Sequence, residues 1–129
     1  MKSLLAFIAL FLAIGTTAVF SQTDTVQILS PNHFNRVLQL NPEVELIDVS
    51  TRMEFKKGHI KGAYLAQNSE DLYRLIDSLG TSKVYLLYCK YGERSVDAGK
   101  IIYEKYKISV CSLEGGLDAW LQEGKEIEN

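Results

Sequence analysis

The sequence predicts an α/β fold built on a mainly parallel sheet, and two observations support this class. Short apolar runs alternate with longer segments in which apolar residues recur at helical spacing. Residues 84–88 form an unbroken apolar run, which is typical of a strand covered on both faces in a parallel sheet. The chain has 129 residues, a length that suits one domain with a single hydrophobic core.

The elements follow from these patterns in order along the chain. Strands are expected at residues 44–49, 63–65, 84–88 and 108–113. Helices are expected at residues 30–41, 69–80, 96–106 and 117–124. The helix that opens at Ser69 is the clearest, because its apolar residues fall on one face and Gly80 closes it. Pro31 suits the first position of the preceding helix.

The first 21 residues differ from the rest and are interpreted as a secretory signal peptide. Lys2 is followed by eleven apolar residues, 4–14, and then by a region of small residues. Cleavage is expected after Ala18 or Ser21, and the domain is expected over residues 22–129. The alternative is an uncleaved anchor helix, but the apolar run is shorter than the ~20 residues that a bilayer span needs. We expect export, to the periplasm in a bacterial host, with no stable membrane association after cleavage.

The overall charge excludes some partners. The formal net charge is −2, and the sequence has no basic amphipathic helix, so neither nucleic acid nor a membrane surface is an expected partner. A small anion would have to be attracted by local charges.

Polar residues follow two of the predicted strands, at the point where each strand ends. One group runs from Asp48 to Arg52, and the other runs from Cys89 to Arg94. Ligands of open parallel sheets bind beyond the carboxyl ends of the strands. Both groups are therefore expected at the same edge of the sheet.

The loop after residues 84–88 has the composition of a nucleophile cradle. A tight turn from strand to helix directs backbone N–H groups inward, and Gly92 allows a positive φ. These groups and the cations of Lys90 and Arg94 favour the thiolate of Cys89, which is the nucleophilic form. The alternative is a small buried cysteine beside a solvated helix start. The combination of Cys, Gly and Arg at this spacing favours the chemical interpretation.

Four segments share their order and spacing with one known family. They are residues 46–49 with Arg52 and Glu54, residues 58–63, residues 89–95, and residues 113–116 with Trp120. In these segments the chain resembles the rhodanese-like sulfurtransferases, and the resemblance runs over most of residues 26–126. It implies a three-layer fold in which helices cover both faces of a mostly parallel, five-stranded sheet.

The resemblance also implies a chemistry for Cys89. In that family the loop cysteine accepts a sulfane sulfur from a donor such as thiosulfate or a persulfide. It carries the sulfur as a persulfide and passes it to a thiol or to cyanide, without a metal or an organic cofactor. Cys89 is then the catalytic residue. The residues expected at the substrate are Lys90, Tyr91, Gly92, Glu93 and Arg94 in the loop, and Asp48 and Arg52 at the neighbouring strand end.

Two residues of the loop, Glu93 and Tyr91, are unexpected in a loop that has to admit an anionic donor. Glu93 places a carboxylate beside Lys90 and Arg94, which partly offsets their charge. A doubly charged donor such as thiosulfate is therefore expected to bind poorly, and a persulfide on a small thiol or on a partner protein is an alternative donor. Tyr91 is bulky and either lines the entrance or packs on the sheet.

Three residues outside the loop are interpreted as mainly structural. Arg52 and Glu54 are expected to support the fold, with substrate contact by Arg52 as the alternative. His59 is expected to fix a turn by hydrogen bonding, because a thiolate needs no general base.

Two other function classes stay open. Cysteine phosphatases and arsenate reductases share the architecture but place five residues between Cys and Arg, whereas four lie between Cys89 and Arg94. A shorter cradle suits one sulfur atom better than a tetrahedral oxyanion. The other class is a non-enzymatic module that binds a partner or relays sulfur. Such domains usually lose the loop cysteine, and this chain keeps it.

The second cysteine, Cys111, raises the question of a disulfide. An exported protein with two cysteines invites one, but Cys89 must be free to carry sulfur. Cys111 falls within a predicted strand, whereas Cys89 lies beyond the end of another, and a bridge needs Cα atoms within about 7 Å. We expect Cys111 to be structural, with a reversible bridge as the alternative.

Overall fold

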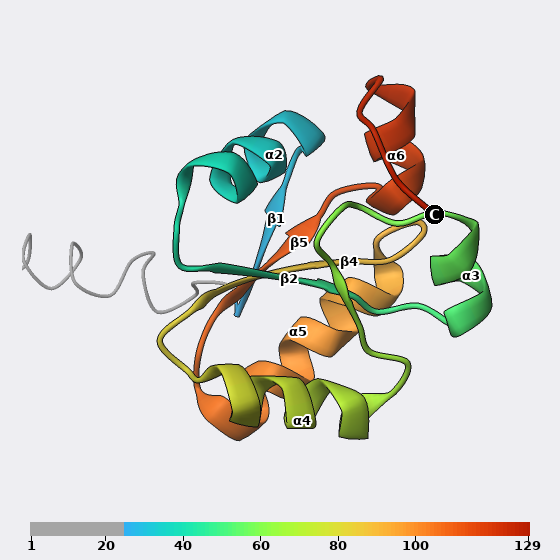
Figure 1. The fold of residues 1–129 in the computed structure, drawn as a ribbon. Helices are drawn as coiled ribbons and strands as arrows, with labels where there is room; N and C mark the ends of the chain where they lie inside the picture. Colours follow the sequence, from blue (N-terminus) through green and yellow to red (C-terminus); the bar gives the residue numbers. More distant parts are fainter. Residues whose placement is uncertain (1–24) are drawn as a thin grey trace, which may run out of the picture.

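The computed structural model of the chain describes residues 25–129, which form a five-stranded sheet between two layers of helices (Figure 1). The strands are β1 (Val26–Leu29), β2 (Val44–Asp48), β3 (Tyr64–Leu65), β4 (Val84–Tyr88) and β5 (Val110–Leu113). Their order in the sheet is β1-β5-β4-β2-β3, and every neighbouring pair is parallel. The predicted α/β class is confirmed. The predicted signal peptide lies outside the described residues and stays a prediction.

Helices cover both faces of this sheet. They are α2 (Pro31–Leu40), α3 (Arg52–Lys57), α4 (Ser69–Leu79), α5 (Glu93–Tyr106) and α6 (Gly116–Gln122). In Figure 1, α2 and α6 lie on one side of the sheet, and α4 and α5 lie on the other. The core is divided accordingly: one buried cluster contains Ile76 and Ile102, and the second contains Phe34 and Trp120. No helix within residues 25–129 has the length and apolar character needed to cross a membrane.

Local capping signals set the helix ends. The Ser30 hydroxyl accepts a hydrogen bond from the amide of His33 at 3.2 Å, so α2 begins where the sequence predicts. The cap of α4 is Asn68, whose side chain accepts from the Asp71 amide at 2.8 Å. Gly80, with a φ of 100°, ends α4 as expected.

The sequence patterns do not predict two of the elements. In β1 only Val26 and Leu29 are buried, so this edge strand lacks the continuous apolar run of β4. Helix α3 has six residues and none is buried, so it has no apolar periodicity. Strand β5 begins at Val110 instead of residue 108, because the backbone turns left-handed at Lys107, with a φ of 58°, where α5 ends.

Candidate active site

The ends of β2 and β4 lie side by side, as predicted, because these strands are parallel neighbours. Asp48 at the end of β2 is in register with Tyr88 at the end of β4. The Val49 amide donates to the Tyr88 carbonyl at 2.8 Å, which extends the pairing by one residue. The segments that follow lead into α3 and α5, and they share this edge of the sheet.

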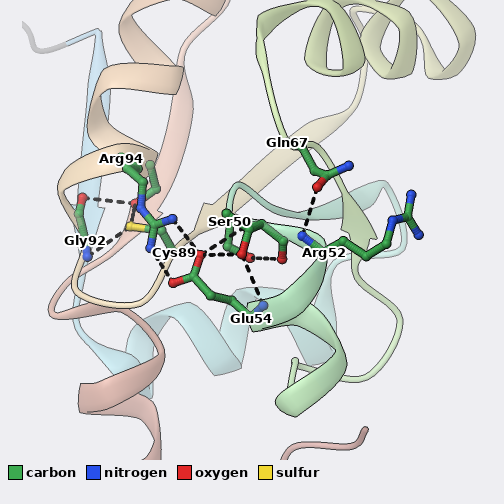
Figure 2. A network of polar contacts seen from close by, with 9 residues as sticks. Ser50, Arg52, Glu54, Gln67, Cys89, Gly92 and Arg94 are labelled. Carbon is green, nitrogen blue, oxygen red and sulfur yellow. Dashed lines mark hydrogen bonds and ion pairs between the residues drawn. The ribbon is translucent and has the colours of Figure 1, made fainter.

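Cys89 lies at the base of the loop between β4 and α5, and its sulfur faces the start of α5 (Figure 2). The Gly92 amide donates a hydrogen bond to Sγ at 3.1 Å. A φ of 105° lets Gly92 turn its N–H towards the sulfur, and most other residues resist this conformation. Helix α5 starts at the next residue and has 14 residues, so the positive end of its dipole lies at this loop. Both features place positive electrostatic potential at the Cys89 sulfur.

A buried pair of hydroxyl groups, from Ser95 and Ser112, lies next to the sulfur. Ser95 is fully buried, and its Oγ lies 3.6 Å from the Cys89 Sγ and donates to the Gly92 carbonyl at 3.0 Å. Ser112 of β5 lies 2.7 Å from the same hydroxyl oxygen. The pair joins the first turn of α5 to β5, and it fixes where the loop places the sulfur. The sequence does not predict this pair, because a contact between a helix and a strand leaves no local pattern.

The beginning of α6 rests on the same loop. The amides of Leu117 and Asp118 donate to the carbonyls of Cys89 and Lys90, at 2.8 and 3.0 Å. Gly116 allows this close approach, since a Cβ on this residue would lie 2.5 Å from the carbonyl carbon of Lys90. The loop that carries the sulfur is therefore held by β4, by α5 and by α6.

Arg94 forms a two-pronged ion pair with Glu54 of α3 (Figure 2). The Nη1–Oε1 and Nη2–Oε2 distances are 2.8 and 3.0 Å. Hydrogen bonds from Arg94, with a further one from the Thr51 backbone, lower the pKa of Glu54 to about 2. The sequence alone points to Glu93 as a carboxylate that partly offsets Lys90 and Arg94. Glu93 is exposed at the start of α5, and Glu54 is the residue that contacts the guanidinium.

A local signal for Glu54 was present in the sequence. Thr51 and Glu54 form a capping box, in which the Thr51 hydroxyl accepts from the Glu54 amide and the Glu54 carboxylate accepts from the Thr51 amide. The Thr-x-x-Glu spacing therefore indicates the start of α3. It does not indicate that the same carboxylate also reaches Arg94, 40 residues away.

The side chains of Lys90 and Tyr91 lie close together at the loop. The Lys90 ammonium is 5.3 Å from the centre of the Tyr91 ring, and the Tyr91 side chain is exposed. Tyr91 lines a shallow surface depression with Ile28 and Glu93, and it does not line the cavity beside Cys89.

A cavity of about 220 Å³ opens beside Cys89. Its polar lining comes from β2, α3 and the cysteine loop: Asp48, Ser50, Glu54, Lys57 and Lys90. Its apolar lining comes from α6 and from residues 125–129, which we call the C-terminal tail: Leu117, Leu121 and Ile127. Three of the residues predicted at the site, Cys89, Lys90 and Asp48, therefore line one cavity. The apolar wall of this cavity is not predicted from the sequence.

Asp48 is buried, with 2% of its surface exposed, and its Oδ1 has no hydrogen-bond partner. Burial raises the pKa of this carboxyl, although hydrogen bonding to Ser50 and Tyr88 acts in the opposite direction. The Tyr88 hydroxyl accepts from the Ile60 amide at 2.9 Å.

Within residues 25–129, no group of three or more His, Cys, Asp or Glu side chains is placed to hold a metal ion.

Arg52 is not brought to the sulfur. It is the first residue of α3, its amide donates to the Gln67 side chain at 2.9 Å, and its exposed side chain extends away from Cys89 (Figure 2). Arg52 lines a different surface depression, with Phe55 and Leu65, because α3 directs this side chain away from the cavity. Its expected substrate contact is therefore not supported, and the structural interpretation is favoured.

His59 fixes a turn, as predicted. Its Nδ1 lies 2.9 Å from the Phe55 carbonyl oxygen, and its ring stacks on Phe55 with 3.7 Å between the ring centres. Its backbone exchanges two hydrogen bonds of 2.9 Å with Glu128, and its Nε2 lies 3.4 Å from the Glu128 carboxylate. His59 therefore connects the end of α3 to the C-terminal tail.

Cys111 is far from Cys89 along the sheet. It is in register with Leu86, three residues before Cys89 on β4. Three residues of a parallel strand span about 10 Å, which exceeds the ~7 Å between Cα atoms that a disulfide tolerates. Both cysteines are free, and burial raises the pKa of the Cys111 thiol. This placement fits a structural Cys111.

Comparison with known proteins agrees with this fold. The model of the rhodanese-like domain matches residues 31–123. The thiosulfate sulfurtransferase GlpE of Shewanella oneidensis is 30% identical over 88 residues, which are 67% of this chain and 86% of that protein. The chain belongs to the rhodanese-like domain family, a family that includes sulfurtransferases.

Solved structures share the fold. A thiosulfate sulfurtransferase from Pseudomonas aeruginosa superposes with a TM-score of 0.71 at 24% identity, over 80% of this chain and 19% of that one. A protein from Rhodopseudomonas palustris described as a possible tyrosine phosphatase has a TM-score of 0.71 at 24% identity, over 81% of this chain and 86% of that one. At this identity the two likenesses establish the fold alone.

Proposed function

We propose that the chain is a sulfurtransferase that carries sulfane sulfur as a persulfide on Cys89. The observation that carries the proposal is the position of Sγ, which accepts the Gly92 N–H at 3.1 Å at the start of α5. A positive helix end and an inward N–H stabilise negative charge on sulfur, both on the thiolate and on the outer sulfur of a persulfide. The relationship to a thiosulfate sulfurtransferase supports the same chemistry.

The reaction has two displacement steps. In the first, the Cys89 thiolate attacks the sulfane sulfur of the donor. The donor's S–S bond breaks, and the leaving group departs with the electron pair as sulfite or as a thiolate. In the second, a thiolate or cyanide attacks the outer sulfur of the persulfide, and Cys89 leaves as its thiolate. Each step exchanges one sulfur–sulfur bond for a bond to the new nucleophile, so no external oxidant or reductant is consumed.

The test is intact-mass analysis after exposure of the purified protein to thiosulfate or to a thiol persulfide. We expect a gain of one sulfur atom, which cyanide or excess thiol removes. Loading that requires a particular partner protein would instead favour a sulfur relay. Hydrolysis of aryl phosphates that depends on Cys89, without sulfur loading, would favour a phosphatase and overturn the proposal.

Glu54→Gln is expected to improve the use of thiosulfate. Gln keeps the capping-box role at the start of α3, so the helix is retained. It removes the carboxylate that neutralises Arg94, and the guanidinium then contributes a net positive charge near Cys89. We expect the KM for thiosulfate to fall roughly three- to ten-fold, since one screened charge contact contributes about 1 kcal/mol.

Steady-state assays with cyanide as the acceptor measure this effect, and Glu93→Gln is the matched control. Glu93 is exposed and has no ion pair with Arg94, so removal of its charge is expected to change KM less. If the two substitutions lowered the KM for thiosulfate equally, the effect would come from the net charge of the protein and not from the loss of the Arg94–Glu54 contact.

A further inference from the structure

One wall of the cavity beside Cys89 is apolar and is built from the C-terminal end of the chain. Leu117 and Leu121 of α6 and Ile127 of the C-terminal tail form it. Leu121 keeps 46% of its surface exposed, although it is a large apolar residue next to a reactive sulfur. Such a wall does not contribute to the binding of an inorganic anion, because aliphatic side chains offer an anion neither hydrogen bonds nor charge.

The wall is fixed in place by contacts of the tail. A Cβ at Gly58 would lie 2.5 Å from the Ile127 side chain, so this glycine makes room for Ile127. The backbone of the next residue, Glu128, exchanges two hydrogen bonds with His59, and Trp120 Nε1 donates to the Glu126 carbonyl at 3.0 Å. These contacts hold the tail in a fixed position, so it forms a defined wall of the cavity.

The charges at the cavity suit a donor with one negative charge. Glu54 in the lining is paired with Arg94, and Lys57 and Lys90 are the two lysines of the described lining. A monoanionic donor brings one negative charge close to the buried carboxyl of Asp48. A dianion such as thiosulfate adds one more negative charge near the buried carboxyl of Asp48.

We propose that this cavity binds the organic arm of a monoanionic sulfane donor, such as an organic thiosulfonate or a thiol persulfide, and that Leu121 and Ile127 determine this specificity. The inference rests on the proposed sulfurtransferase function. With a thiosulfonate, the Cys89 thiolate attacks the terminal sulfur and forms the persulfide anion. The S–S bond to the sulfonyl group breaks, and the sulfinate leaves with the electron pair, so charge and electrons balance.

The experiment compares three donors with the full chain: thiosulfate, methanethiosulfonate and benzenethiosulfonate. The two thiosulfonates have the same charged head and differ only in the arm. Each kcat/KM value is divided by the rate constant with which the same donor reacts with a free thiol, which removes differences in intrinsic reactivity. The ratio of the two corrected values then reports binding of the arm. We expect this ratio, phenyl over methyl, to be at least about ten-fold, because apolar burial of a few carbons has this effect. Thiosulfate is expected to be the poorest of the three.

Leu121→Gln tests the wall, since Leu121 is partly exposed and its replacement leaves the core intact. We expect the phenyl-to-methyl ratio to fall at least three-fold in Leu121→Gln. Leu40→Gln is the matched control: Leu40 is 74% exposed at the end of α2 and does not line the cavity, so the ratio should not change.

The outcomes separate this inference from the function on which it rests. If no donor loads sulfur on Cys89, the proposed function fails. If all three donors load it but the ratio is near one, or is unaffected by Leu121→Gln, the sulfurtransferase stands and the arm site is overturned. Ile127→Ala provides a second variant, and a fall in the same ratio with an unchanged thermal midpoint supports the wall.

Discussion

Cys89→Ser is expected to abolish sulfur loading and turnover, whereas Cys111→Ser is expected to keep most of both. A serine hydroxyl is not ionised at neutral pH and cannot hold a sulfane sulfur in a disulfide-like bond, so no persulfide forms. The fold should persist. Serine is nearly the size of cysteine, and its oxygen can still accept the Gly92 N–H that now reaches Sγ.

The paired variants separate two explanations for a loss of activity. Cys111 packs against the core cluster of α2 and α6, so its replacement by serine costs some stability but removes nothing from the cavity. Intact-mass analysis after exposure to a thiol persulfide measures loading, and a thermal melt checks folding. Sulfur loading that survives in a folded Cys89→Ser protein would move the reactive group elsewhere. Loss of activity in Cys111→Ser without loss of stability would reopen the reversible bridge.

The sequence predicted the parts of the fold that depend on local pattern. The apolar run of β4 and the capped helices α2 and α4 lie where periodicity and capping residues place them. The meeting of the loops after β2 and β4 also follows from sequence, because parallel neighbouring strands end at the same edge. The position of Cys89 beneath an inward N–H required only a strand, a glycine and a helix in succession.

The features that were not predicted come from contacts between distant segments. The pairing of Glu54 with Arg94 joins residues on two different helices, and the Ser95–Ser112 contact joins a helix to a strand. The apolar wall with Ile127 arises because the tail returns to Gly58 and His59. Such contacts depend on the three-dimensional arrangement of elements, which periodicity does not encode. These contacts also determine the positive charge that a substrate meets, because Glu54 neutralises Arg94.

The contact between α6 and the cysteine loop leads to the second prediction with a large effect. Gly116→Ala is expected to destabilise the protein and to suppress sulfur loading together. The new Cβ would lie 2.5 Å from the carbonyl carbon and oxygen of Lys90, both of which are backbone atoms that cannot rotate away. Relief requires α6 to move, which breaks the hydrogen bonds from Leu117 and Asp118 to the loop carbonyls.

Gly124→Ala provides a control for this substitution. Both glycines have positive φ, 63° at Gly116 and 77° at Gly124, so alanine is strained at either position by about 1–2 kcal/mol. A Cβ at Gly124 meets nothing within 4 Å, whereas the one at Gly116 adds an overpacking cost of roughly 1–3 kcal/mol. Chemical denaturation should therefore show a larger loss of unfolding free energy for Gly116→Ala. Mass analysis of the folded fraction should show slower loading of Cys89 in Gly116→Ala only, because only this substitution displaces the loop. Equal losses of stability and equal loading rates in the two variants would mean that the docking of α6 does not position the sulfur.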